Sequence, residues 1–148
     1  MGRIQGETLI RLGLIIEQML RLNHISIAVR DIQKFGELYS RLFGLSFSSP
    51  KSVDTQKVKL SFAEIQGAKL ELISPASGEG SIPTFLDKKG EGLHHICFEV
   101  GGLDEVLEDL MKKGVEVIGK PTMGSSGKRI VFLHPKSTGG VLIELKES

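Results

Sequence analysis

The sequence has little of several residue types on which whole classes of protein depend. Its 148 residues include no tryptophan, one tyrosine and one cysteine (Cys97), and the formal net charge is +1. Such a chain lacks the basic surface and stacked rings of nucleic-acid-binding proteins, and it lacks the charge that anionic membranes attract. A lone cysteine excludes an internal disulfide and fits a reducing compartment. We therefore expect a cytoplasmic protein with no nucleic-acid or membrane partner.

The sequence also lacks a hydrophobic run long enough to span a membrane. The longest candidate, LIRLGLII at residues 9–16, is short and interrupted by Arg11, and no small-residue cleavage site follows it. Residues 1–18 are expected to be an extension before a single domain over residues 19–148, with Met19 a second plausible start. An ordinary N-terminal helix packed on the domain is an equal alternative.

What the sequence does contain is a pattern of a strand, a helix and further strands that occurs twice. Alternating β-branched residues predict strands, and apolar residues at helical spacing, closed by Gly44, Gly90 and Gly114, predict helices. One face of the first helix is expected to carry Ile32, Phe35, Tyr39 and Leu42. The predicted strands are 22–29, 57–64, 69–73, 93–100, 115–121, 128–135 and 140–146, and the predicted helices are 31–44, 81–90 and 103–114.

An internal duplication relates the two halves. LNHISIAV and LHHICFEV align with a shift of 71 residues, which places His24 on His95, and the closing strands KLELIS and VLIELK align Glu71 with Glu144. We predict an α+β fold of two paired β-α-β-β-β modules, about residues 20–75 and 91–147, joined by the helix 81–90. The modules should form a curved mixed sheet around one shared site.

The duplicated residues have the chemistry of a metal site. Because side chains alternate across a strand, His24, His95, Glu71 and Glu144 are expected to stand apart from their apolar neighbours. Two imidazoles and two carboxylates suit Zn, Co, Ni, Mn or Fe better than Ca or Mg. A bound cation would also offset the cost of burying Glu144 in an apolar strand.

Other polar residues receive structural interpretations. His94 is expected on the opposite side of its strand from His95, and His134 is expected in a loop. Cys97 is interpreted as a wall of the site and not as a nucleophile, since no motif places a base beside it. The segment GSSGKR, 124–129, lacks the spacing of a nucleotide-binding loop and is predicted to be a flexible lid or hairpin loop.

These residues also carry a resemblance to a known family. The paired modules with this placement of His and Glu resemble the vicinal oxygen chelate superfamily of glyoxalases and bleomycin resistance proteins. Within it, LNHISIAV, FLDKKGEGLHHICFEV and KRIVFLHPKSTGGVLIEL resemble the methylmalonyl-CoA epimerase family over about residues 20–146. The resemblance implies a homodimeric isomerase that interconverts (R)- and (S)-methylmalonyl-CoA, an acyl-CoA substrate, by proton transfer through a metal-stabilised enolate.

The resemblance assigns site residues one by one. It places metal ligands on His24, His95 and Glu144, and the fourth ligand, often Gln in the family, on Glu71. Glu144 is expected to move the proton on one face of the α-carbon. On the other face we expect Glu71 or Lys59; the latter stands where some epimerases have a Glu base, and it would need a lowered pKa to act as one.

The resemblance also assigns substrate contacts to the loop HPKSTGG. The ammonium of Lys136 and the backbone N–H groups of Ser137 to Gly140 are expected to meet anionic oxygens of the substrate. The predicted substrate-binding residues are Lys136, Ser137, Thr138 and Gly139.

Two other functions remain open. A glyoxalase I uses the same fold and a His/Glu ligand set, although its relatives resemble an Asp-Pro-x-Gly turn where this chain has HPKSTGG. A non-catalytic binder of the same fold is disfavoured because such proteins generally lack the complete ligand set. The native metal and the second acid/base residue are also left open.

Overall fold

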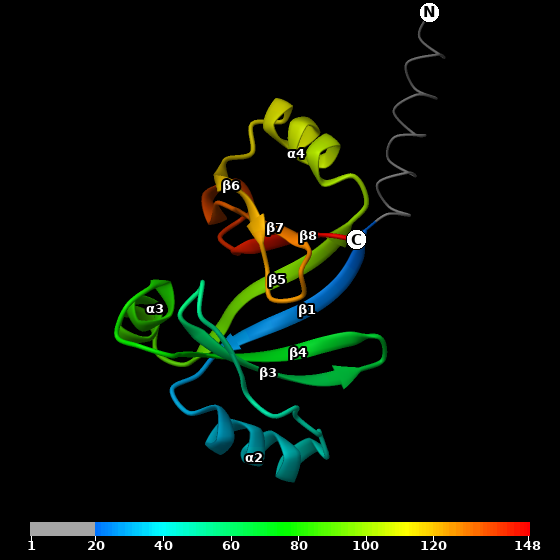
Figure 1. Ribbon diagram of the computed structural model, residues 1–148. Coiled ribbons are helices and arrows are strands. Elements are labelled where there is room, and N and C mark those ends of the chain that lie inside the picture. The colour runs from blue at the N-terminus through cyan, green and yellow to red at the C-terminus, as the bar shows by residue number, and fades with distance from the viewer. Residues whose placement is uncertain (1–19) are drawn as a thin grey trace, which may run out of the picture. The chain divides into compact units, whose positions relative to one another are not determined.

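The computed structural model describes residues 20–148, and the expected extension 1–18 lies outside the described residues. The chain divides into two compact units (Figure 1). One comprises residues 23–97, and the other includes residues 98–148 together with the short segment 20–22. The division falls within strand β5, Gly92–Val100.

The unit of residues 23–97 is built on a mixed sheet. Its strands run in the order β2-β3-β4-β1-β5. β1 and β4 are parallel, whereas β3 is antiparallel to both β2 and β4. The turn between β3 and β4 lies at Gln66-Gly67, and both residues have positive φ. The bounds are β1 Arg21–Ala28, β2 Lys51–Val53, β3 Val58–Ile65 and β4 Ala68–Pro75.

Helix α2, Ile32–Phe43, covers one face of this sheet. Asp31 caps its start by accepting the Lys34 N–H, and Gly44 ends it in the left-handed conformation. The core on this face joins sheet and helix residues: Ile27, Val29, Leu72, Ile32, Phe35 and Tyr39. Leu42, the last of the four residues predicted to share this helix face, is 52% exposed near the helix end. Gly36 is buried instead, close to Phe47 and Leu72.

Helix α3, Ser81–Lys89, packs against residues of the opposite face. Its Ile82 and Leu86 join a core with Ala28, Leu60 and Ile73. Because β1 side chains alternate, the face that carries Ala28 also carries Ser26 and His24. The apolar core under α3 therefore continues along β1 toward the polar residues of the candidate site.

The unit that contains residues 98–148 has one helix on a second set of strands. These run in the order β5-β8-β7-β6, and β7 is antiparallel to both β6 and β8. Arg129 on β7 donates two hydrogen bonds to Asp104 at the start of α4 and two to Glu147 on β8. The bounds are α4 Leu103–Lys112, β6 Val117–Met123, β7 Arg129–Leu133, the short 3₁₀ helix η1 Pro135–Ser137, and β8 Ile143–Glu147.

The order of elements confirms the predicted α+β class with two β-α-β-β-β modules: β1-α2-β2-β3-β4 and β5-α4-β6-β7-β8. The helix expected at 81–90 is α3. The sequence interpretation missed the three-residue strand β2 and the helix η1, since both are too short to show a periodic pattern. None of the helices within residues 20–148 is long and apolar enough to cross a membrane.

Candidate metal and catalytic site

The centre of the candidate site is a pair of buried histidines on two strands. His24 lies on β1 and His95 on β5, and their side chains are 6% and 5% exposed. The two Nε2 atoms are 3.1 Å apart, and the rings meet edge to face with centroids 5.2 Å apart. Side-chain alternation predicted that both histidines lie on the same side of their strands, and the structure confirms this for the pair.

Glu71 on β4 is the third member of this cluster. In the strand register it lies beside Ser26 of β1 and Phe62 of β3. The Ser26 hydroxyl donates to Oε1 of Glu71 at 2.8 Å. Glu71 Oε2 lies 3.6 Å from Nε2 of His24, and Oε1 lies 4.0 Å from Nε2 of His95. The structure thus brings together three of the four predicted ligands within one unit.

The spacing of this cluster fits a divalent metal ion. Two nitrogen ligands about 2.1 Å from one ion, at an angle of about 90–110°, lie about 3.0–3.4 Å from each other. The Nε2 atoms of His24 and His95 meet this condition, and a carboxylate oxygen of Glu71 is close to each of them. Imidazole and carboxylate ligands together suit Zn and the other first-row ions that the sequence analysis named.

Apolar side chains border the cluster. Phe62 meets the ring of His24 edge to face, with centroids 6.3 Å apart. Leu60, two residues earlier on β3, lies on the same face and is buried. Cys97 is fully buried two residues after His95, consistent with the interpretation of a structural thiol. Such walls exclude water, and charges act more strongly in a dry site than in solvent.

Glu144, the fourth predicted ligand, belongs to the other unit. It lies on β8 between Ile143 and Leu145, opposite Phe132 of β7 in the strand register. Its side chain is 7% exposed. The burial of a carboxylate in this apolar strand is the feature that the sequence analysis expected.

The structure does not bring Lys59 to the cluster, and this corrects the sequence prediction. Phe62 and Leu60 point to the same side of β3 as Glu71 on the neighbouring strand. Lys59 lies an odd number of positions from both, so its side chain is on the opposite face. It is also exposed. Sequence alignment alone missed this, because an offset of one residue along a strand moves a side chain to the opposite face of the sheet.

The loop 134–140 differs from the predicted anion cradle. Three backbone N–H groups that were expected to meet substrate, those of Ser137, Thr138 and Gly140, donate to carbonyls of His134 and Pro135. The backbone-amide part of the prediction is therefore wrong for these three residues. Lys136 pairs with Glu116 at 2.7 Å, and both side chains are exposed. This is a compact turn closed by its own hydrogen bonds.

The remaining polar residues are placed largely as expected. His134 precedes η1 in a loop, and its Nδ1 accepts the Lys136 N–H. Residues 124–128 form the loop between the antiparallel strands β6 and β7, so the hairpin alternative for GSSGKR is confirmed. Nδ1 of His94 lies 2.8 Å from Nδ1 of His95.

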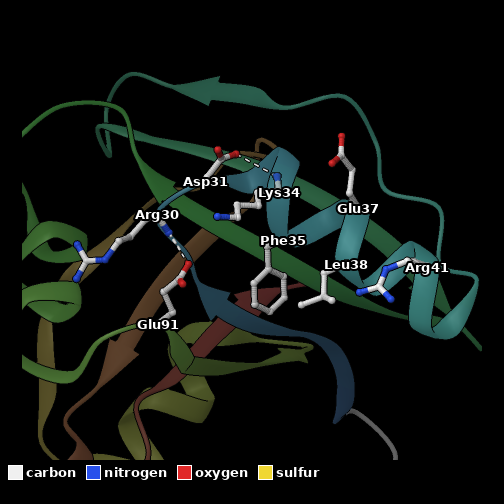
Figure 2. Close-up of a pocket in the computed structure, with 8 residues that line it drawn as sticks. All are labelled: Arg30, Asp31, Lys34, Phe35, Glu37, Leu38, Arg41 and Glu91. Carbon is white, nitrogen blue, oxygen red and sulfur yellow. Dashed lines mark hydrogen bonds between the residues drawn. The ribbon is translucent and has the colours of Figure 1, made fainter.

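A separate hollow of about 680 Å³ opens beside the start of α2 (Figure 2). Its lining mixes cations, carboxylates and the apolar side chains of Phe35 and Leu38. Two polar contacts organise it: the Arg30 N–H donates to Glu91, and the Lys34 N–H donates to Asp31. No predicted site residue lines it. The lining residues are Arg30, Asp31, Lys34, Phe35, Glu37, Leu38, Arg41 and Glu91.

Comparisons with a family model and with known proteins agree on the family of this chain. Residues 23–132 match the model of the glyoxalase/bleomycin resistance protein/dioxygenase superfamily. The uncharacterized protein YqjC of Bacillus subtilis (strain 168) is 42% identical over 87% of this chain and 93% of its own length. Mitochondrial methylmalonyl-CoA epimerase of Homo sapiens is 37% identical over 86% of this chain and 74% of its own.

Two further proteins extend this result. Ethylmalonyl-CoA/methylmalonyl-CoA epimerase of Cereibacter sphaeroides is 37% identical over 86% of this chain and 97% of its own. A solved methylmalonyl-CoA epimerase in complex with methylmalonyl-CoA and NH4+ superposes with a TM-score of 0.81 at 34% identity, covering 88% of this chain and 95% of that one. The chain therefore belongs to the glyoxalase/bleomycin resistance protein/dioxygenase superfamily and, within it, to the methylmalonyl-CoA epimerase family.

Proposed function

We propose that this protein is a metal-dependent epimerase that interconverts (R)- and (S)-methylmalonyl-CoA. The observation that carries the proposal is the buried cluster of His24, His95 and Glu71, which has the donor types and spacing of a divalent-metal site. The similarity to methylmalonyl-CoA epimerases over nearly the whole described chain supports the choice of substrate.

His24, Glu71, His95 and Glu144 would together hold one divalent cation, with Co, Zn, Ni, Mn and Fe as the candidates. In support, His24, His95 and Glu144 are all buried and offer two imidazoles and one carboxylate. When bound, such a cation supplies Lewis-acid stabilisation of the negative charge that develops on the substrate oxygens. Glu71 would be held in position by the Ser26 hydroxyl.

Epimerisation needs a proton acceptor on one face of the α-carbon and a proton donor on the other. We assign one face to Glu144. For the second face we assign Glu71, because Lys59 lies on the opposite side of β3 from the cluster. One residue, ionised as the carboxylate, removes the α-proton to give the enolate, and the other, which starts as the carboxylic acid, gives its proton to the opposite face and ends as the carboxylate. The roles exchange for the reverse reaction.

The acyl-CoA tail would meet the loop 135–140. Four residues were predicted to contact the substrate there: Lys136, Ser137, Thr138 and Gly139. They differ in how readily they could bind the tail. The Lys136 ammonium is exposed and its ion pair with Glu116 is screened by solvent, so it can be redirected to a phosphate at little cost. We also propose that the protein is a homodimer, on the basis of the family resemblance. Its single cysteine is the basis for proposing that it is cytoplasmic.

The test is turnover by the full-length protein, purified without chelator and supplied with one metal at a time. Conversion of (S)-methylmalonyl-CoA to the (R) form should require metal and should stop when EDTA is added. The hemithioacetal of methylglyoxal and glutathione is the control substrate. Turnover of that control, with no conversion of methylmalonyl-CoA, would replace the proposal with a glyoxalase activity.

A further inference from the structure

Each of the two cluster histidines is preceded in sequence by a residue that contacts its second ring nitrogen. The side-chain oxygen Oδ1 of Asn23 lies 2.7 Å from Nδ1 of His24. Nδ1 of His94 lies 2.8 Å from Nδ1 of His95. In both cases Nδ1 is the nitrogen that faces away from the cluster, because the Nε2 atoms face each other. The same arrangement therefore occurs on two strands.

The internal duplication relates these two contacts. The 71-residue shift that places His24 on His95 also places Asn23 on His94. The two halves thus keep the geometry of the contact while using different side chains for it. A hydrogen-bond partner on the outer nitrogen of a metal-binding imidazole fixes its tautomer and its orientation and raises its basicity.

The two partners act differently because their chemistry differs. An amide oxygen only accepts, so the contact with Asn23 requires the hydrogen of His24 to be on Nδ1 and leaves the Nε2 lone pair toward the cluster. An imidazole nitrogen either donates or accepts. His94 can therefore accept from Nδ1 of His95 when the Nε2 lone pair of His95 is needed in the cluster.

The ring of His94 is itself held in place. Phe85 of α3 meets it edge to face, with centroids 4.8 Å apart, and His94 is half-buried. The contact between His94 and His95 is thus supported by the packing of α3 on this part of the unit. A rotation of His94 would lose both the aromatic contact and the hydrogen bond.

We propose that Asn23 and His94 are positioning residues that hold His24 and His95 with Nε2 directed at the metal, so that they set the affinity of the site. The inference rests on the proposed metal site and deepens it. It also changes the interpretation of His94, which does not serve as a ligand but orients one.

The experiment measures Co²⁺ binding to the metal-free full-length protein by competition with a chromophoric chelator. Asn23→Leu removes the acceptor at similar volume, and His94→Phe keeps an aromatic ring against Phe85 while removing the nitrogens. Each should weaken Co²⁺ binding about 10- to 100-fold, the usual effect of losing such a partner. The absorption spectrum at saturating Co²⁺ should stay that of the wild type, because the ligands are unchanged.

Rescue variants separate positioning from a general effect on folding. Asn23→Asp restores an acceptor and His94→Asn restores a polar partner, so both should bind Co²⁺ more tightly than Asn23→Leu and His94→Phe. Thermal unfolding of the metal-free variants reports any loss of stability on its own. Wild-type affinity in Asn23→Leu and His94→Phe would overturn the inference, as would an altered saturated spectrum in either.

The outcome distinguishes this inference from the proposed function. If the wild-type protein binds Co²⁺ and the variants weaken it, but methylmalonyl-CoA is not converted, the positioning role stands and the substrate assignment fails. If the wild-type protein binds no divalent ion, both the metal site and the positioning role are overturned.

Discussion

The Nε2 atoms of His24 and His95 face each other at 3.1 Å although the residues are 71 positions apart in the chain. They come from the two equivalent strands of a duplicated module, and both are buried. Two imidazole nitrogens at this distance can share one hydrogen or one cation. The nearby carboxylate of Glu71 favours the cation, because a buried negative charge is stabilised by a positive one.

Replacing either histidine should therefore abolish stoichiometric metal binding. We expect His24→Ala and His95→Ala to lower the affinity for Co²⁺ at least 100-fold, measured by equilibrium dialysis and elemental analysis. His134→Ala is the matched control, because this loop histidine should leave binding unchanged. Full metal content in both cluster variants would place the site elsewhere.

The hydroxyl of Ser26 should stabilise the fold through Glu71. Ser26→Ala leaves Oε1 of a carboxylate that is 4% exposed without this donor. We expect the free energy of unfolding of the metal-free protein to fall by about 1–3 kcal/mol, measured with urea. The control is Ser40→Ala, whose hydroxyl donates to Leu45 in an exposed position and should matter less. Equal losses in the two variants would show that burial of Glu71 is not responsible.

Lys59 should be dispensable. Its side chain is exposed on the face of β3 opposite the cluster, so Lys59→Met should change the rate of inversion by less than about twofold. Glu71→Gln should instead slow proton exchange for one diastereomer. A loss of 100-fold or more in Lys59→Met would return this lysine to the mechanism and contradict our assignment of the second face.

Glu144 should carry the proton on the other face. Glu144→Gln keeps a side-chain oxygen for the metal but cannot take up a proton, so inversion should fall about 10²-fold or more. Exchange of the α-proton with deuterium should survive for one diastereomer, through the residue on the opposite face. Elemental analysis must show that the variant keeps its metal. Normal inversion at full metal content would remove Glu144 from proton transfer.

The ion pairs of Arg129 should make the stability of the fold depend on pH. Hydrogen bonds from Arg129 hold the pKa of Asp104 and of Glu147 below their usual values. This contribution is complete above the ordinary carboxyl pKa of about 4 and is lost as the pH falls through the lowered values. Arg129→Gln should therefore unfold at a lower temperature than the wild type at pH 7. The difference should shrink steadily below about pH 4, and a constant difference would contradict this origin.

The grouping of His24, His95 and Glu71 was predictable because alternation along a strand and a duplicated pattern are both visible in sequence. His24 and His95 illustrate this, since one 71-residue shift relates their strands. Lys59 shows the limit of the approach. Its assignment depended on an alignment offset, and in a strand an offset of one residue exchanges the two faces.

Hydrogen bonding between neighbours was also invisible in sequence. Alternation placed His94 on the opposite side of its strand from His95, and Asn23 drew no prediction, yet both contact the outer nitrogen of the following histidine. The turn at 134–140 was misjudged because the resemblance assigned its backbone N–H groups to the substrate. The structure shows that those of Ser137, Thr138 and Gly140 donate to carbonyls within the loop.

The most direct test of the account follows the α-proton of methylmalonyl-CoA in deuterated buffer with the metal-loaded protein. Mass spectrometry and a diastereomer-specific assay report deuterium uptake and inversion together. We predict that inversion is accompanied by uptake of solvent deuterium, that EDTA stops both, and that adding back Co²⁺ restores both. Inversion that continues at an unchanged rate in protein shown to be free of metal would contradict it.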